Sequence, residues 1–474
     1  MKFSFLSLAA ALLLPVTLAA GSTTDNTTGL LVGTARVDIT PYPNPHWLPL
    51  DEFAHEKLHV RAIVYENNDV RGAFVNCELA FIQDGIYKTA NKLVAEALNT
   101  SLANVLVSIT HAHSAGPAGV TNANQYGNAA VRNYSSLGLA AVEAATLALG
   151  NLKPAKVGYN TGEAFFNVNR DALDPLTGRW TQAANLSGPV DRAVQVLTFL
   201  GRDDNAPIAS YTSYGMHPVN SYLSGFTTGD WPAAMMRWIE TSMSVNDTFV
   251  AIFSQQASGD VNPLLRRAGT NNLASISSVP ITGFELVQEC VEEPVRDGYT
   301  PFVRPDDHYI RQLFRELEAQ GVMMGEIVMQ IMSQTTDFDD SPTIWAAQET
   351  VSCPGRKRLD SAREGVAGVY TTGPNFNVTT GAVGLGDVVL VTVGGEIFTR
   401  IGWRIKNETA GLMHKTMIVT MVNGQPSGYI PDSLSFDQET FQVLGTSLMP
   451  GTCAEISITN SLVSMVNQYK ATLA

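Results

Sequence analysis

The sequence has 474 residues, of which 45% are hydrophobic and 16% are charged, with 39 glycines and 23 prolines. This composition is typical of a globular protein with a large core, and it excludes collagen-like and intrinsically disordered chains. The 30 Lys and Arg residues stand against 44 Asp and Glu residues, which gives a net charge of −14. Because a negative chain repels phosphate backbones and anionic membrane surfaces, the charge argues against nucleic-acid binding.

The first twenty residues have the pattern of a secretory signal peptide. Lys2 supplies a positive start, residues 3–14 form an apolar run, and Ala19-Ala20-Gly21 offers the small residues needed for cleavage near Ala20. The apolar run is shorter than the ~20 residues that span a bilayer, and no later segment qualifies as a transmembrane helix. We therefore expect a protein that is secreted or resides in the lumen of the secretory pathway.

Glycosylation and disulfide bonds would suit that compartment. Seven Asn-x-Ser/Thr sequons predict glycosylation at some of their asparagines: Asn26, Asn99, Asn133, Asn185, Asn246, Asn377 and Asn407. The four cysteines are Cys77, Cys290, Cys353 and Cys453. They are too sparse for a zinc ribbon or a redox CxxC motif, so one or two disulfides are expected in an oxidising lumen. The first choice of pair is Cys290 with Cys353.

Short β-branched apolar runs, each followed by polar residues or glycines, predict strands. In chain order they are residues 105–109, 208–214, 249–253, 388–393 and 417–422. A 3.6-residue spacing of apolar positions predicts helices at 87–98, 233–243 and 308–332. Strands that deliver polar residues at their C-terminal ends indicate an α/β protein whose site lies at one edge of a sheet.

The chain shows no internal repeat and no low-complexity linker, so we expect a single domain over residues 21–474. Its predicted fold class is α/β, with a mixed sheet or sheets flanked by helices and a metal site at the C-terminal ends of strands.

Two histidines follow the first predicted strand. Side chains at i and i+2 on an extended segment point the same way, so His111 and His113 can both bind one ion, or one can bind while the other moves protons. A hydrogen-bonded turn with surface histidines would show the same pattern. His217 also follows a predicted strand, just before Pro218, although a hydrogen-bonded histidine in the core would fit that position too.

A carboxylate completes this candidate set. Glu396 lies where an apolar strand gives way to Gly394-Gly395, and an acid there is either a partner for a helix N-terminus or a metal ligand. Two histidines and a carboxylate from three strand ends match the ligands of a hydrolytic zinc site, in which one coordination position stays open for water.

Seven short motifs, taken in order, resemble those of the neutral ceramidase family. They are GTARVDITP at 33–41, HAHSAGP at 111–117, GMHP at 215–218, GDVNP at 259–263, CP at 353–354, GGE at 394–396 and GYIP at 428–431. The resemblance spans roughly residues 30–467 and covers the catalytic region. It implies a zinc amidase that cleaves the N-acyl bond of ceramide, with one zinc per chain held by His111, His217, Glu396 and Tyr429.

The same resemblance implies roles for further residues. His113 would be the acid and base beside the metal-bound water, and Arg170 would hold the amide oxygen as it becomes an oxyanion. For Asn169 we expect a structural role in a turn. Asp230 matches a family motif without an assigned role.

Two positions depart from the family pattern. Asn262 replaces a serine of the Gly-Asp-Val-Ser-Pro motif, which excludes covalent serine catalysis there. Phe441 replaces a second tyrosine twelve residues after the ligand tyrosine, which removes a phenolic donor from the expected oxyanion site. The extra C-terminal β-sandwich domain of longer family members is not expected in this chain.

The sequence therefore predicts a secreted zinc-dependent amidohydrolase that uses metal-activated water on a sphingolipid-like or other small-molecule or lipid amide. One alternative is a non-hydrolytic cyclisation, condensation or isomerisation of a small metabolite on a diverged ceramidase-like fold. Another is a lipid-binding homologue with weakened catalysis. His113 and Arg170 argue against the last of these, because neither is needed to bind zinc.

Overall fold

The structure is a computed structural model and describes residues 29–40, 56–115, 117–118, 134–221, 227–243, 248–265, 307–424 and 428–473. The predicted signal peptide, Cys290 and the sequons at Asn26, Asn133 and Asn246 lie outside the described residues. Within the described part of the chain, no helix is both long and apolar enough to cross a membrane.

The largest sheet is nine-stranded and mixed. Its order is β12 (Val250–Gln255), β11 (Pro207–Tyr214), β10 (Ala193–Gly201), β7 (Lys153–Glu163), β1 (Leu31–Asp38), β2 (His59–Asn67), β3 (Val70–Cys77) and β5 (Val105–Ile109), with β14 (Phe338–Asp339) beside β7. The sheet nearly divides between β1 and β7, which share only two paired positions. The half that contains β3 then folds against β11 and β12, where the rings of Phe74 and Tyr211 lie 4.9 Å apart.

A second sheet covers this one. It is four-stranded, in the order β15 (Ile344–Arg358), β16 (Tyr370–Leu385), β17 (Val388–Val393) and β19 (Lys415–Thr420). Three small sheets complete the set: β13 (Val261–Pro263), β8 (Asn167–Asp174) and β9 (Arg179–Asn185); β18 (Glu396–Ile397) and β20 (Tyr429–Ile430); and β4 (Phe81–Ile82) and β6 (Pro117–Ala118).

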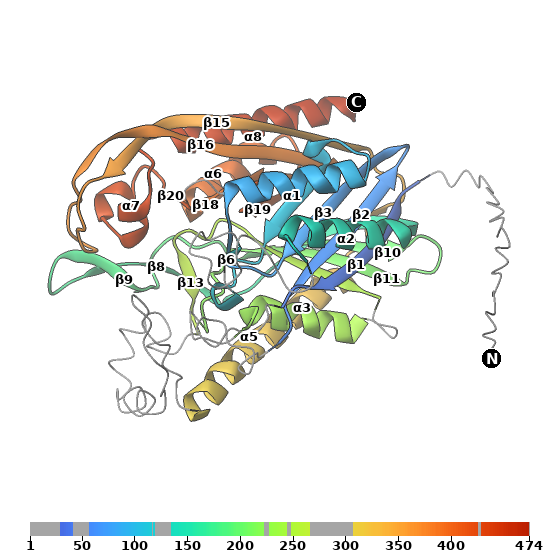
Figure 1. Cartoon of the computed structure of the whole chain (residues 1–474), viewed down its shortest axis with the longest axis horizontal. Helices are drawn as coiled ribbons and strands as arrows, with labels where there is room; N and C mark the ends of the chain where they lie inside the picture. Colours follow the sequence, from blue (N-terminus) through green and yellow to red (C-terminus); the bar gives the residue numbers. More distant parts are fainter. Residues whose placement is uncertain are drawn as a thin grey trace, which may run out of the picture.

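Helices cover the outer faces of the sheets (Figure 1). The helices are α1 (Asp84–Ala97), α2 (Leu137–Gly150), α3 (Asp230–Met243), α5 (Asp307–Ser333), α6 (Thr399–Ala410), α7 (Phe441–Gly445) and α8 (Cys453–Thr472). Short 3₁₀ turns occur at η2 (Leu102–Asn104), η3 (His113–Ala115) and η5 (Phe436–Gln438). Helices α1 and α2 pack on the β1–β5 half, α3 and α5 on the β10–β12 half, and α6 and α8 on the four-stranded sheet.

Side-chain alternation along the strands builds the core between these layers. Alternate residues of β2, such as Ile63 and Tyr65, face the cluster between the two large sheets, whereas Ala62 and Val64 face α1 and α2. A strand that buries both faces reads as a continuous apolar run. The expected α/β class with mixed sheets and flanking helices is therefore confirmed.

Each strand that precedes a candidate ligand belongs to a parallel pair: β5 pairs with β3, β11 with β12, and β17 with β19. The sequence predicted a site at one edge of one sheet. The structure instead brings together strand ends from different sheets, because β5 and β11 belong to the large sheet and β17 belongs to the four-stranded one.

One disulfide joins the hairpin formed by β15 and β16 to the C-terminal helix α8. Cys353 in β15 bonds to Cys453 at the start of α8, with their Cα atoms 5.9 Å apart. The expected pairing of Cys353 with Cys290 is therefore wrong. Helix α8 packs against β15 and β16, and this packing makes Cys453 the partner of Cys353. The bond joins residues that are 100 positions apart in the sequence. Cys77 is a buried free thiol.

Candidate metal centre and its surroundings

His111 stands two residues after the end of β5. Its backbone N–H donates to the Leu79 carbonyl at 3.0 Å, and the preceding Thr110 N–H donates to the Cys77 carbonyl at 3.1 Å. The His111 φ angle is 67°, in the left-handed region that few residues other than glycine adopt. These backbone bonds hold the turn that directs the imidazole inward, where it is almost fully buried.

Both buried histidines are oriented by carbonyl groups. Nδ1 of His111 lies 2.6 Å from the Ala80 carbonyl oxygen, and Nδ1 of His217 lies 3.0 Å from the Val261 carbonyl oxygen. A carbonyl only accepts, so each Nδ1 carries the proton and each Nε2 keeps its lone pair. Such a second bond is the usual way in which proteins orient histidine ligands of metals.

Glu396 approaches the same point from the four-stranded sheet. Its N–H donates to the Gly428 carbonyl at 2.9 Å, and β18 pairs Glu396 with Tyr429 of β20. Gly394 is required in this turn, because a Cβ there would lie 2.4 Å from the Gly424 carbonyl oxygen. The turn places Oε2 of Glu396 3.2 Å from Nε2 of His217 and 3.3 Å from Nε2 of His111.

These three atoms form a nearly equilateral triangle, because the two Nε2 atoms are also 3.2 Å apart. A tetrahedral zinc ion with bonds of ~2.0–2.1 Å separates its ligand atoms by about 3.3–3.4 Å. The geometry therefore fits one small tetrahedral cation bound to His111, His217 and Glu396.

The protonation states suit ligands. Burial would raise the pKa of Glu396, but His111 and His217 beside it hold that pKa well below its usual range. Burial and the positive charge of Arg170 lower the pKa of His217 to about 3. The carboxylate is thus ionised and the His217 imidazole neutral, as metal ligation requires.

His113 lies beside the triangle. It begins η3, is half-buried, and its ring centroid is 4.8 Å from that of His111 and 5.8 Å from that of His217. Among the described residues, these three histidines form the one cluster whose ligand atoms lie within 4.8 Å of one another. Burial and the two neighbouring histidines lower the pKa of His113 well below its usual value.

Arg170 and Tyr429 line the next side of the site. Arg170 is buried in β8, and its Cζ lies 5.3 Å from the centroid of the Tyr429 ring. Burial lowers the pKa of Arg170, but interactions with Tyr429 and Asp171 outweigh this effect and raise it. The guanidinium is fixed by donation from Nη2 to the Gly259 carbonyl at 2.6 Å.

Both departures from the family motifs also lie here. Oδ1 of Asn262 accepts a bond of 3.4 Å from Nη1 of Arg170. The Phe441 ring lies 4.9 Å from Cζ of Arg170 and packs edge-on against Tyr429, with 5.6 Å between ring centroids. The structure thus brings all the predicted site residues into one neighbourhood.

Asn169 has a structural role, but it lies within strand β8 and not in the turn that was expected. Its amide donates to the Pro189 carbonyl and to Oδ2 of Asp260, both at 3.0 Å, and its Oδ1 accepts from the Asp171 N–H. Oδ1 of Asp260 in turn accepts from the N–H and the hydroxyl of Thr399, both at 2.8 Å. This chain of bonds ties β8, which carries Arg170, to the start of α6.

Asp230 holds the loop after His217, a role that the sequence did not reveal. Its carboxylate accepts from the N–H and hydroxyl of Ser221, at 2.7 and 2.6 Å, and from the N–H of Trp231 at 2.8 Å. The Trp231 indole donates to the His217 carbonyl at 3.3 Å, and the His113 N–H donates to the Pro218 carbonyl. The sequence shows only an acid where a helix begins. It does not distinguish a buried acid that holds a loop from an exposed helix cap.

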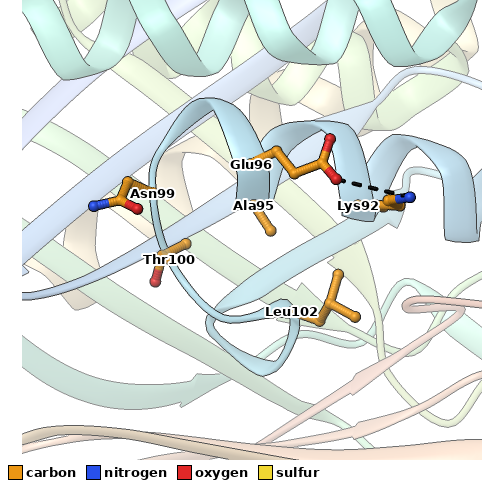
Figure 2. Close-up of a pocket in the computed structure, with 6 residues that line it drawn as sticks. All are labelled: Lys92, Ala95, Glu96, Asn99, Thr100 and Leu102. Atoms are coloured by element: carbon orange, nitrogen blue, oxygen red, sulfur yellow. Dashed lines mark ion pairs between the residues drawn. The ribbon is translucent and has the colours of Figure 1, made fainter.

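The two larger hollows found in the described part of the chain lie away from this site. One of about 480 Å³ lies beside the end of α1 and is lined by Lys92, Ala95, Glu96, Asn99, Thr100 and Leu102 (Figure 2). The ion pair drawn there joins Lys92 to Glu96 at 3.7 Å. The other, of about 560 Å³, shares Lys92 and Leu102 and extends to β15 and β16. Neither is lined by a residue of the candidate metal centre.

Part of the chain matches a known protein family. Residues 51–280 match the family described as neutral/alkaline non-lysosomal ceramidase, N-terminal. Neutral ceramidase B of Dictyostelium discoideum is 27% identical over 251 residues, which are 49% of this chain and 34% of that protein. The chain thus matches about a third of the length of this curated relative.

Solved structures share the fold. The crystal structure of neutral ceramidase from Pseudomonas aeruginosa has a TM-score of 0.68 at 14% identity, over 94% of this chain and 75% of that one. A ceramidase complexed with C2 has a TM-score of 0.68 at 16% identity, over 94% and 76% of the two chains. The resemblance that the motif series predicted is confirmed over residues 51–280, which match the model of the neutral/alkaline ceramidase N-terminal region, and the solved ceramidases share the fold.

Proposed function

We propose that this protein is a secreted, zinc-dependent amidohydrolase that cleaves the N-acyl bond of a lipid or other small-molecule amide. The observation that carries the proposal is the triangle of His111, His217 and Glu396, whose ligand atoms are 3.2–3.3 Å apart. Tyr429, the partner of Glu396 in the β18–β20 pairing, is the proposed fourth ligand. The neutral ceramidase family supports an amide as the substrate.

A zinc ion in this site would supply a Lewis acid and lower the pKa of water toward neutrality. His113 stands beside the ligand histidines, with its ring 4.8 Å from that of His111, so it can take a proton and return it to the departing amine. Its low pKa keeps the imidazole neutral before the reaction, as a base must be. Arg170, held by the Gly259 carbonyl, offers a fixed positive charge to the oxyanion.

A second candidate is a non-hydrolytic reaction of a small metabolite at the same centre. The observation that favours it is Phe441, whose apolar ring packs on Arg170 and Tyr429 where the family has a phenol. A reaction in which no oxyanion develops would not need the donor that this phenol supplies.

The test combines metal analysis with product analysis. We expect one zinc per chain by elemental analysis, and amide cleavage in a screen of acyl amides that includes ceramides. Two products whose masses sum to that of the substrate plus one water identify hydrolysis. A single product of unchanged mass identifies isomerisation, and one lighter by one water identifies a dehydrative cyclisation. His217→Ala should lose zinc and activity together, while the exposed His414→Ala is the matched control and should keep both. Full zinc in His217→Ala would contradict the proposed ligand set.

A further inference from the structure

The backbone of residues 77–80, which we call the template segment, holds the first ligand histidine in place. The Cys77 carbonyl accepts from the Thr110 N–H at 3.1 Å. The Leu79 and Ala80 carbonyls accept from the N–H and the Nδ1–H of His111, at 3.0 and 2.6 Å. The position of this imidazole therefore depends on how firmly the template segment is held.

Glu78 is the charged residue of the template segment, and its side chain is buried. Its Oε1 accepts from Nη1 of Arg61, and its Oε2 accepts from the His59 N–H at 2.5 Å. Burial would raise the pKa of Glu78, but Arg61 and His59 lower it to about 2. The carboxylate is thus ionised and ties the template segment to strand β2, which contains both partners.

Arg61 also binds helix α3. It is buried, and it donates from Nε to Oε1 of Glu240 at 2.8 Å and from Nη2 to Oε2 at 3.3 Å. The Ala251 N–H donates to the same Glu240 carboxylate at 3.1 Å. The guanidinium of Arg61 therefore bridges two carboxylates, Glu78 in the template segment and Glu240 on α3. A hollow of about 270 Å³ is lined by all three residues of this bridge.

Helix α3 supports the second ligand histidine at its N-terminal end. It begins at Asp230, whose carboxylate accepts from the N–H and the hydroxyl of Ser221 in the loop after His217. The Trp231 indole of the same helix donates to the His217 carbonyl at 3.3 Å. Arg61 thus connects the support of one ligand histidine to the support of the other.

We propose that Arg61 and Glu78 are positioning residues that set the spacing of the two ligand histidines and thereby the affinity for zinc. The inference rests on the proposed ligand set and concerns residues that do not touch the metal themselves. Removing groups that orient metal ligands typically weakens metal binding by roughly 10- to 100-fold. A buried ion pair with a purely structural role would affect stability without affecting the ligand imidazoles.

The test measures the dissociation constant of zinc, by competition with a chelator, on the full chain from which metal has been removed. We expect Glu78→Ala to weaken zinc binding by about 10-fold or more. Glu78→Gln keeps an oxygen acceptor for Arg61 and should recover part of the loss. The matched control is Glu66→Ala, which removes a carboxylate paired with Arg71 at 2.5 Å, at the other end of the β2–β3 pair. It should leave zinc binding unchanged.

A second measurement does not need zinc. In the metal-free protein, the Nδ1 proton of His111 should give a downfield NMR signal that exchanges slowly, because the Ala80 carbonyl accepts it in a buried place. We expect this signal to be lost in Glu78→Ala and kept in Glu66→Ala. If Glu78→Ala does not fold, Arg61→Lys takes its place, since an ammonium group lacks the fork that reaches both carboxylates.

Equal losses of zinc affinity in Glu78→Ala and Glu66→Ala would show a general effect on stability and overturn the proposal. Unchanged zinc affinity in Glu78→Ala, or an unchanged His111 signal in that variant, would overturn it as well. If the wild type binds no zinc, the proposed function fails, and the His111 signal alone then decides whether Glu78 positions the imidazole.

Discussion

Asn262 and Phe441, the two positions that depart from the family motifs, both contact Arg170. Asn262 accepts a hydrogen bond from its guanidinium, and Phe441 lies against the same group. Neither residue orients Nδ1 of His111 or His217, which the Ala80 and Val261 carbonyls hold. The departures therefore alter the surroundings of the proposed oxyanion group and leave the ligand triangle intact.

Restoring both family residues tests this view. We expect the double variant Asn262→Ser with Phe441→Tyr to raise ceramide hydrolysis by up to ~10²- to 10³-fold, the value of one oxyanion donor. Activity on a ceramide is measured beside the control Phe165→Tyr, which adds the same hydroxyl to an exposed ring. If the protein's own reaction is a different one, its native activity should fall in the double variant. No change in either activity would place both positions outside the reacting centre.

Replacing His111 and replacing His113 should have different effects on zinc content and on turnover. His113→Ala is expected to keep its zinc and to lose roughly 10²-fold or more in turnover, the scale for a positioned acid or base. His111→Ala should lose the metal, because its Nε2 is one corner of the triangle. Zinc content and turnover are measured on both variants. Equal zinc loss in both would make His113 a ligand instead.

At the scale of elements, the short buried strands were the most predictable. The run predicted at 388–393 is strand β17, and the run at 105–109 is strand β5. The long hairpin of β15 and β16 was not predicted, because its outer half leaves the core and alternates poorly between buried and exposed positions. An apolar pattern reports burial, so a strand that is paired but exposed gives little signal.

The Cys353–Cys453 disulfide fastens that hairpin to α8. In a chain-entropy account, closing a loop of 100 residues restricts the unfolded chain strongly. We expect Cys453→Ser to lower the free energy of unfolding by about 2–4 kcal/mol. Denaturant unfolding of the variant, compared with the wild type with and without reductant, measures the effect. Equal stability in all samples would mean that the bond is absent from the folded protein.

At the scale of the whole molecule, the sequence predicted the residues that form the candidate site. It did not predict the residues that hold them in place. His111, His217 and Glu396 follow apolar runs, and their chemistry is rare enough to stand out. Asp230 acts through its contacts with the loop after His217. Its chain position carries no such signal, since these contacts exist only once separate segments have packed.

The described sequons differ in how far their asparagines are exposed. Asn99, Asn377 and Asn407 are exposed, whereas Asn185 is half-buried and donates from Nδ2 to the Asp171 carbonyl at 2.8 Å. We expect glycans on the three exposed asparagines of the secreted protein and an unmodified Asn185. Mass spectrometry of peptides before and after deglycosylation gives the occupancy of each position. A glycan on Asn185 in active protein would contradict the observed hydrogen bond.

The left-handed backbone of His111 sets function against stability. In that conformation, a residue with a Cβ lowers the stability of the fold by roughly 1–2 kcal/mol compared with glycine. The imidazole of His111 is therefore present at this position at a cost in folding stability. The two deletions of the imidazole should then differ, with His111→Gly unfolding at a higher temperature than His111→Ala although both lack the ligand. If selection acted on stability alone, we expect His111 to be the first of the candidate ligands to be replaced by glycine.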